Sequence, residues 1–248
     1  MNKNPSQKPE PPSRSSPWYM LISRTILFIA FQALVAFLYL ITGNNEAWES
    51  SAAWWPFTVI LTNIVCIYLL KFLFRREGKN FNDLFRFERQ YLKPDIKVVF
   101  GFLLVAGPVV MLPNILLAQG LFGDQTTASS MMFQHLPTLA AGIAILIFPF
   151  SQGLAELPTY FGYIMPRLKR TTHNTLMAIA LPSIMLGIQH IGVPLLFDWQ
   201  FVIYRLFMFL PFAFMLGILL YWRPRLLPYM AIVHVVMNLS TAVLFFGS

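Results

Sequence analysis

The chain has 248 residues, of which 57% are hydrophobic and 11% charged, and its mean hydropathy is +0.62. Soluble domains carry about 25% charged residues, so this composition excludes an ordinary soluble domain and predicts an all-α protein with several transmembrane helices. The net charge of +8 comes from lysines and arginines that mostly flank apolar segments, where membrane topology places them. We therefore expect the lipid bilayer as a partner and no nucleic acid.

Seven apolar segments are long enough to cross about 30 Å of hydrocarbon, which takes about 20 helical residues. In chain order they are 19–41, 54–74, 97–119, 137–160, 174–194, 200–221 and 225–246. Residues 1–18, rich in Pro, Ser and Lys, are expected to form a disordered cytoplasmic tail. Residues 19–248 are expected to form a single membrane domain.

The loops on the two sides of the predicted bundle differ in charge. Lysines and arginines precede the first segment, follow the second and fourth, and separate the sixth from the seventh. The opposite loops hold Glu46, Glu49, Asp124 and Asp198 and no lysine or arginine. The positive-inside rule therefore predicts a cytoplasmic N-terminus and, with an odd number of helices, a C-terminus outside.

The longest basic loop, 75–97, has the sequence RREGKNFNDLFRFERQYLKPDIK. Its aromatic residues are interspersed with charges, a pattern that an amphipathic helix lying on the inner leaflet would give. An ordinary charged connector is the alternative, and the sequence does not decide between the two.

One acid and two imidazoles inside apolar helices are the primary candidates for a site. Glu156 lies in GLAELPTYFGYIMPRL, His190 in SIMLGIQHIGVP and His234 in YMAIVHVVMNLS. Ionisable groups are costly at this depth and usually face a cavity or one another. We therefore expect a polar cavity between the fourth to seventh helices that opens toward the membrane or the cytoplasm. Each histidine alone is also typical of interhelical hydrogen bonding.

Spacing adds further candidates. Asn238 follows His234 by four residues, so both lie on one helix face, and Tyr160 follows Glu156 by four residues as a candidate supporting donor. A buried carboxylate with polar neighbours is typical of a general base. Arg205 is expected to be an interfacial residue whose charge reaches the headgroups; the alternative is a structural pair with Glu156.

Together these motifs resemble the intramembrane CAAX-protease and bacteriocin-processing (CPBP, Abi) family. Its signature has Glu-Glu-x-x-x-Arg on one helix, Phe-x-x-x-His on the next and His-x-x-x-Asn or Asp near the C-terminus. Glu156, His190, His234 and Asn238 fall on these positions, and GYIMPRL at 162–168 matches a tail found in many bacterial members. The resemblance covers roughly 150–242, within a family-like core placed at 137–242, and it implies a bacterial cell membrane.

The chain departs from the signature at two positions of the first motif. Leu157 stands where the family has its second glutamate, and Phe161 where it has an arginine. Without that arginine, no neighbouring residue in the sequence neutralises Glu156, and Tyr160 is the candidate replacement that would orient it. Leu186 also replaces the phenylalanine of the second motif.

The resemblance implies an intramembrane endopeptidase, a hydrolase that cleaves a membrane-associated peptide or protein. Glu156, helped by His190, would activate water, and His234 with Asn238 would hold the oxyanion. No metal is expected; the alternative is zinc held by Glu156, His190 and His234. Two other functions stay open: a catalytically impaired protein acting in membrane peptide binding, immunity or scaffolding, and a proton-coupled transporter with a water path across both faces.

One geometric requirement follows from these assignments. Glu156 lies toward the inner side of the fourth predicted helix, whereas His190 lies toward the outer side of the antiparallel fifth helix. At about 1.5 Å per residue, their heights differ by roughly 15 Å. The two side chains can meet if the fourth helix continues through GYIMPR, and we predict that it does.

Overall fold

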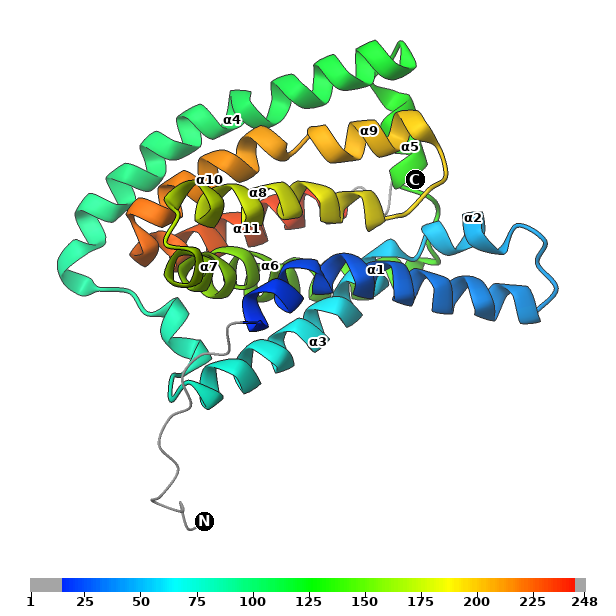
Figure 1. Cartoon of the computed structure of the whole chain (residues 1–248). Coiled ribbons are helices and arrows are strands. Elements are labelled where there is room, and N and C mark those ends of the chain that lie inside the picture. Colours follow the sequence, from blue (N-terminus) through cyan, green and yellow to red (C-terminus); the bar gives the residue numbers. More distant parts are fainter. Residues whose placement is uncertain (1–14, 244–248) are drawn as a thin grey trace.

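The computed structural model describes residues 15–243, which form helices joined by short loops (Figure 1). No β-strand occurs among these residues, so the all-α prediction is confirmed. The α-helices are α1 (Ser16–Ile41), α2 (Ala47–Ala52), α3 (Trp55–Arg76), α4 (Leu92–Phe122), α5 (Thr126–Met132), α6 (Thr138–Leu157), α7 (Met165–Thr172), α8 (Thr175–Gln189), α9 (Trp199–Phe207), α10 (Leu210–Trp222) and α11 (Leu227–Ala242). A π-helix at Pro158–Ile164 and a 3-10 turn at His190–Gly192 lie beside the candidate site.

Six helical stretches in the described part of the chain are long and apolar enough to cross a membrane. They are Ser16–Ile41, Trp55–Arg76, Phe81–Phe122, Thr138–Thr172, Thr175–Gly192 and Trp199–Trp222. The predicted seventh segment, 225–246, forms α11, which has 16 residues, and its last residues, 244–246, lie outside the described range. The protein is therefore a polytopic integral membrane protein.

The first helix begins earlier than the sequence suggests. α1 starts at Ser16 and has Pro17 in its first turn, where the missing N–H of proline costs no hydrogen bond. The last residues of the expected disordered tail 1–18 are therefore helical, and residues 1–14 lie outside the described residues.

The basic loop 75–97 does not form a single amphipathic helix. After the end of α3 it contains two short 3-10 turns, Phe81–Phe85 and Arg89–Tyr91, and α4 then begins. Phe81 is buried and its ring packs edge-on against Phe74, with the centroids 6.2 Å apart. The burial of Phe81 and the break into two short turns favour the connector interpretation.

The fourth predicted helix continues through GYIMPR, as the site geometry requires. α6 passes directly into the π-helix and then into α7, so one helical stretch runs over Thr138–Thr172. Pro158 lacks the N–H that would bond one turn back, and a wider π turn begins at this residue. This continuation keeps Glu156 near the middle of the stretch.

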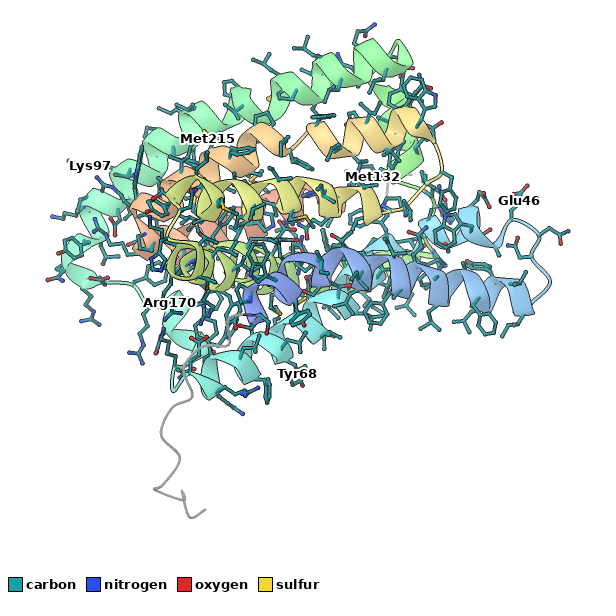
Figure 2. The ribbon with its side chains drawn as sticks, viewed as in Figure 1. Glu46, Tyr68, Lys97, Met132, Arg170 and Met215 are labelled. Carbon is teal, nitrogen blue, oxygen red and sulfur yellow. The ribbon has the colours of Figure 1, made fainter. Side chains whose placement is uncertain are left out.

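The helices pack so that α6 contacts both α3 and α11, α8 contacts α1 and α10, and α4 runs along α9 and α10 (Figure 1). Figure 2 shows Lys97 and Arg170 toward one end of the bundle and Glu46 at the other. We call the end that carries Arg76, Lys97, Arg170 and Arg223 the basic end. Buried apolar side chains fill the bundle toward it: Phe161, Ile164, Leu168, Leu216, Leu220, Leu226, Leu227 and Met230.

Candidate functional site

Glu156 lies on α6 with only 2% of its surface exposed. Its Oε2 accepts hydrogen bonds from two side-chain amides, Gln152 Nε2 at 2.5 Å and Gln189 Nε2 at 2.7 Å. Gln152 is one turn earlier on α6, and Gln189 is the last residue of α8. One carboxylate oxygen is therefore fixed by two donors, which leaves Oε1 available for other partners.

The two amides are held in turn by Arg24 of α1. Arg24 Nη2 donates to Gln152 Oε1 at 3.1 Å, and Arg24 Nε donates to Gln189 Oε1 at 2.8 Å. A third bond runs from Nη1 to Asn63 Oδ1 on α3 at 2.8 Å. Since both amide oxygens face the guanidinium, both amide nitrogens must face Glu156. Arg24 Nη2 itself lies 3.7 Å from Glu156 Oε2, close enough to compensate its charge.

Arg24 is the functional residue that sequence reasoning missed. Besides the two histidines, the sequence offered Tyr160 and Arg205 as partners for the Glu156 carboxylate, and not Arg24. Arg24 stands inside the apolar segment 19–41, and its side chain is fully buried. An ionisable group at that position is the same signal that identified Glu156.

His234 of α11 faces the other oxygen of the carboxylate. His234 Nε2 lies 3.0 Å from Glu156 Oε1, although the N–H is not aligned for a hydrogen bond. Gly153 allows this approach of α11 to α6, because a Cβ there would lie 2.4 Å from Val235 Cγ2 and 3.0 Å from Ala231 O. Two adjacent acceptors would repel each other, so this contact requires that Nε2 carries the proton.

His190 occupies the 3-10 turn that follows α8. Its Nδ1 lies 2.6 Å from the carbonyl oxygen of Leu186, which can only accept, so Nδ1 carries the proton. In the neutral ring Nε2 then has a free lone pair. The imidazole packs against Phe209, with the ring centroids 4.7 Å apart, which fixes its orientation.

Asn238 and Tyr160 each make a hydrogen bond that the sequence did not predict. Asn238 Nδ2 donates to the carbonyl oxygen of His234 at 2.7 Å, so one of its two N–H bonds remains for a ligand. The hydroxyl of Tyr160 donates to Gln189 Oε1 at 3.2 Å and not to Glu156. Tyr160 is therefore attached to the amide that holds the carboxylate.

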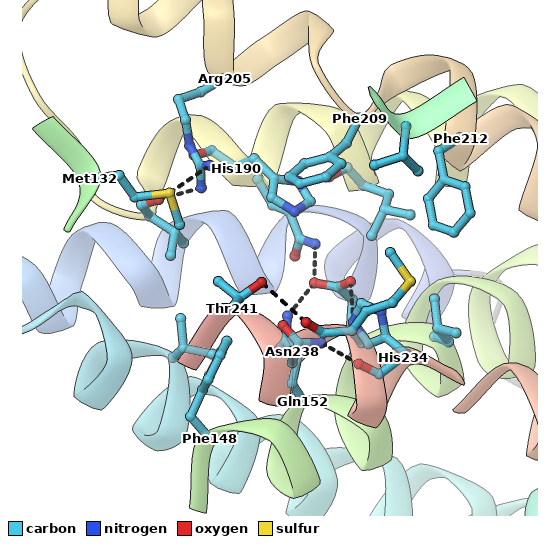
Figure 3. A pocket seen from close by; sticks show the side chains of 18 of the residues that line it. Met132, Phe148, Gln152, His190, Arg205, Phe209, Phe212, His234, Asn238 and Thr241 are labelled. Atoms are coloured by element: carbon cyan, nitrogen blue, oxygen red, sulfur yellow. Dashed lines mark hydrogen bonds and ion pairs between the residues drawn. The ribbon is translucent and has the colours of Figure 1, made fainter. Parts of the chain in front are cut away.

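A cavity of about 400 Å³ has Glu156, His190, His234 and Asn238 in its wall (Figure 3). Figure 3 shows His190 on one side of it and His234 with Asn238 on the other. The predicted fourth to seventh helices all contribute, but so do helices outside that set, through Phe28 of α1, Trp55 of α3, Val110 of α4 and Met132 of α5. Tyr160 is not among the lining residues.

The cavity lies on the side of Glu156 that is remote from the basic end. Trp55 begins α3, whose other end carries Arg76, and Ser240 lies near the far end of α11. Ser240 is exposed, so the cavity reaches the protein surface there. Toward the basic end, α7 and the π-helix pack into the apolar core described above.

Arg205 of α9 is not an interfacial residue, contrary to the expectation from its position. Its side chain is buried, with 1% exposed, and it lines the cavity. Arg205 donates to the carbonyl oxygens of His190 at 3.0 Å and Val193 at 2.5 Å. It forms no ion pair with Glu156, whose cation is Arg24.

The two positions that depart from the family signature are filled by apolar packing. Leu157 is 1% exposed and contributes to the cavity wall. Phe161 is 3% exposed, and its Cε1 lies 3.3 Å from the point where a Cβ on Gly217 would stand. Both side chains are apolar and buried, so neither position leaves a vacant polar site.

The alternative of a zinc ion held by Glu156, His190 and His234 can be tested on the positions of these side chains. Among residues 15–243, no group of three or more His, Cys, Asp and Glu side chains is arranged to hold a metal ion. Glu156 and His234 are in contact, but both donors to Glu156 Oε2 are amides, which are not zinc ligands of the expected set. The arrangement as it stands does not fit a three-ligand zinc site.

Comparison with known proteins gives one match. A family described as type II CAAX prenyl endopeptidase, Rce1-like, matches residues 137–240, which include Glu156, His190, His234 and Asn238. No curated protein and no solved structure matches the chain. Residues 137–240 are thus similar to the Rce1-like family of type II CAAX prenyl endopeptidases.

Proposed function

We propose that this protein is an intramembrane endopeptidase that hydrolyses a membrane-associated peptide or protein with water activated by Glu156. The observation that carries the proposal is the 3.0 Å contact between Glu156 Oε1 and His234 Nε2 in the wall of a cavity. The family match over residues 137–240 supports protease activity in general. The roles of single residues and the substrate are our inference.

In the proposed mechanism, a water molecule lies between Glu156 Oε1 and the carbonyl carbon of the scissile peptide bond. Glu156 takes a proton from this water as the oxygen attacks, and the lone pair of His190 Nε2 accepts the water's other hydrogen bond. The C–O bond forms while the carbonyl oxygen becomes an oxyanion. Glu156 then gives its proton to the leaving amine as the C–N bond breaks.

The oxyanion would be held by His234 and Asn238. His234 Nε2 carries a proton whose present alignment with Glu156 is poor, and Asn238 has an N–H that makes no bond in this structure. Donors placed where negative charge develops commonly contribute about 10²–10³ in rate. Their positions on one face of α11 support this joint role.

A second function is favoured by a specific observation. Leu157 and Phe161 replace two charged residues of the family signature and are buried in apolar packing. A family member that binds a membrane peptide without cutting it, as an immunity or scaffold protein, would keep such a cavity. The transporter alternative is weaker, because packed apolar side chains separate Glu156 from the basic end.

The side of substrate access follows from combining the cavity position with the charged loops. The basic loops are predicted to face the cytoplasm, in a bacterial cell membrane by the family resemblance. The cavity lies in the opposite half of the bundle. We therefore propose that the substrate enters the cavity from the outer half of the membrane and not from the cytoplasm.

The experiment is a cleavage assay on the full chain in lipid vesicles, with a pool of apolar membrane-active peptides and mass spectrometry of the products. Glu156→Gln and His190→Ala should each abolish product formation while the protein remains folded by thermal unfolding. Unchanged processing by both variants would rule out the assigned roles. Binding of peptides without cleavage by the unmodified protein would support the scaffold alternative.

A further inference from the structure

Arg205 brings a positive charge to the wall of the catalytic cavity without a carboxylate beside it. Its side chain is buried, and no Asp or Glu in the described part of the chain forms an ion pair with it. A buried charge without a partner is costly, and buried cations are normally paired. Among residues 15–243, the other two buried arginines obey that rule, since Arg24 lies beside Glu156 and Arg167 beside Glu77.

The hydrogen bonds of Arg205 divide into two groups. Nε and Nη2 donate to the carbonyl oxygens of His190 and Val193, which close the end of α8 and the turn after it. A cation at a helix C-terminus is favourable, so these bonds explain why an arginine can be held there. They do not account for Nη1.

Nη1 of Arg205 points to thioether sulfurs. It lies 3.2 Å from Met132 Sδ and 3.5 Å from Met208 Sδ, and Figure 3 shows Arg205 directed toward Met132 at one end of the cavity. Thioether sulfur is a weak acceptor, whereas a guanidinium binds carboxylates through strong charge-assisted bonds. Methionine side chains are also flexible and adapt to a bound ligand.

Arg205 is connected to the proposed catalytic groups through two hydrogen bonds and two adjacent residues, Gln189 and His190. It bonds to the carbonyl of His190, and the preceding residue is Gln189, whose amide holds Glu156. A peptide bound with its reactive carbonyl at Glu156 would therefore place a group a short distance along its chain near Arg205. The remaining wall between them is mostly apolar.

We infer that Arg205 is a substrate-binding residue that receives a carboxylate of the peptide, either its free C-terminal carboxylate or an Asp or Glu side chain. The inference rests on the proposed function insofar as it assigns the cavity to a peptide. In the bound state the carboxylate replaces the sulfur contacts at Nη1, and the bonds to His190 and Val193 remain.

The test measures binding and cleavage in the same samples of the full chain in lipid nanodiscs. Three fluorescent, N-acylated peptides serve as probes. The first is Ala-Val-Phe-Leu with a free C-terminal carboxylate, and the second is the same peptide with a C-terminal amide. The third also has a C-terminal amide and carries Asp in place of Phe. Fluorescence anisotropy reports binding, and mass spectrometry of the recovered peptide reports cleavage.

Removal of the carboxylate is expected to weaken binding to the unmodified protein by about 10- to 100-fold. Arg205→Gln should remove this preference, and Arg205→Lys should keep part of it because the charge remains. Arg225→Gln, which removes a cation paired with Asp95 outside the cavity, should leave the preference unchanged. Affinity for the Asp-containing amide separates a side-chain carboxylate from a terminal one.

Equal binding of all three peptides by the unmodified protein would overturn the inference, and this comparison needs no variant. A carboxylate preference that persists in folded Arg205→Gln would also overturn it, because Arg205 would then have only its structural role at the end of α8. Carboxylate-dependent binding without cleavage would leave the inference standing and count against the proposed peptidase.

Discussion

Arg24 Nη2 lies 3.7 Å from Glu156 Oε2, although the two residues belong to the first and fourth of the six membrane-spanning stretches. The arginine that the family signature places four residues after the second glutamate is absent here, and Phe161 stands in its position. A cation from another helix therefore supplies the charge that the local motif lacks. Activity of the chain should depend on this pair.

Removal of the cation at position 24 should strongly destabilise the protein. Arg24→Gln leaves a buried carboxylate without its counter-charge, which typically costs about 3–5 kcal/mol. The measurement is thermal unfolding of the purified protein in detergent. The double variant Arg24→Gln, Glu156→Gln is the control and should recover part of the loss. If the double variant is no more stable than Arg24→Gln, the two charges are not coupled.

A methyl group added at Gly153 should push α11 away from α6 and so separate His234 from Glu156. Gly153→Ala places a Cβ against Val235 and the backbone of Ala231, so α11 must shift away from α6. We expect a stability loss of about 1–3 kcal/mol from overpacking and a larger relative loss of hydrolysis. Gly142→Ala on the same helix is the matched control, because nothing lies within 4 Å of its added Cβ. Similar effects of both substitutions would contradict this packing argument.

Asn238 should matter for rate more than for stability. Its side chain bonds only to a carbonyl of its own helix and is partly exposed, so Asn238→Ala should change the unfolding temperature little. If Asn238 holds the oxyanion, kcat should fall by about 10²–10³ with a small change in KM. A change confined to KM would show that Asn238 contributes to substrate binding instead.

The arginine of the GYIMPRL tail should have a structural role. Arg167 donates to both carboxylate oxygens of Glu77, at 2.7 and 2.5 Å, and to the carbonyl of Tyr163 at 2.8 Å. Lysine cannot reproduce this fork, so Arg167→Lys should lower stability by about 1–3 kcal/mol and leave the activity per folded molecule unchanged. Arg170→Lys, at an exposed position of the same helix, is the control.

Hydrolysis should not require an added metal. The proposed steps use Glu156, two imidazoles and an amide, so pre-incubation with a zinc chelator is expected to leave the initial rate unchanged. Loss of activity with the chelator, followed by recovery on addition of zinc, would instead support the ligand set Glu156, His190 and His234. The rate of peptide cleavage in vesicles is the quantity to compare.

The sequence predicts the membrane class and the main site residues for a physical reason. Charges are so costly inside a bilayer that their presence in apolar segments marks candidate functional positions, as with Glu156, His190 and His234, which the structure places around one cavity. The family match over 137–240 covers the same residues. The continuation of α6 into α7 was also predictable, because the proposed site required it.

Other features of the site depend on packing between distant segments. Gln152 and Gln189 are uncharged, so the cost of burying a charge does not single them out in the sequence. Their role is recognised only from their hydrogen bonds to Arg24. The prediction that Arg205 lies at the membrane interface was wrong. Arg205 is covered partly by Met132 of α5, a helix too short to be recognised as a membrane-spanning segment.

The hydrogen bonds of Arg24 also bear on how the protein is assembled. Arg24 lies on α1, which is synthesised before its partners on α3, α6 and, last, α8. An arginine within an isolated membrane helix costs about 2.5–3.5 kcal/mol, and that cost persists until the later helices arrive. The hydrogen bonds of Arg24 are therefore complete only after Gln189 has been made, so chains that stop before Gln189 should hold α1 less firmly than the full chain.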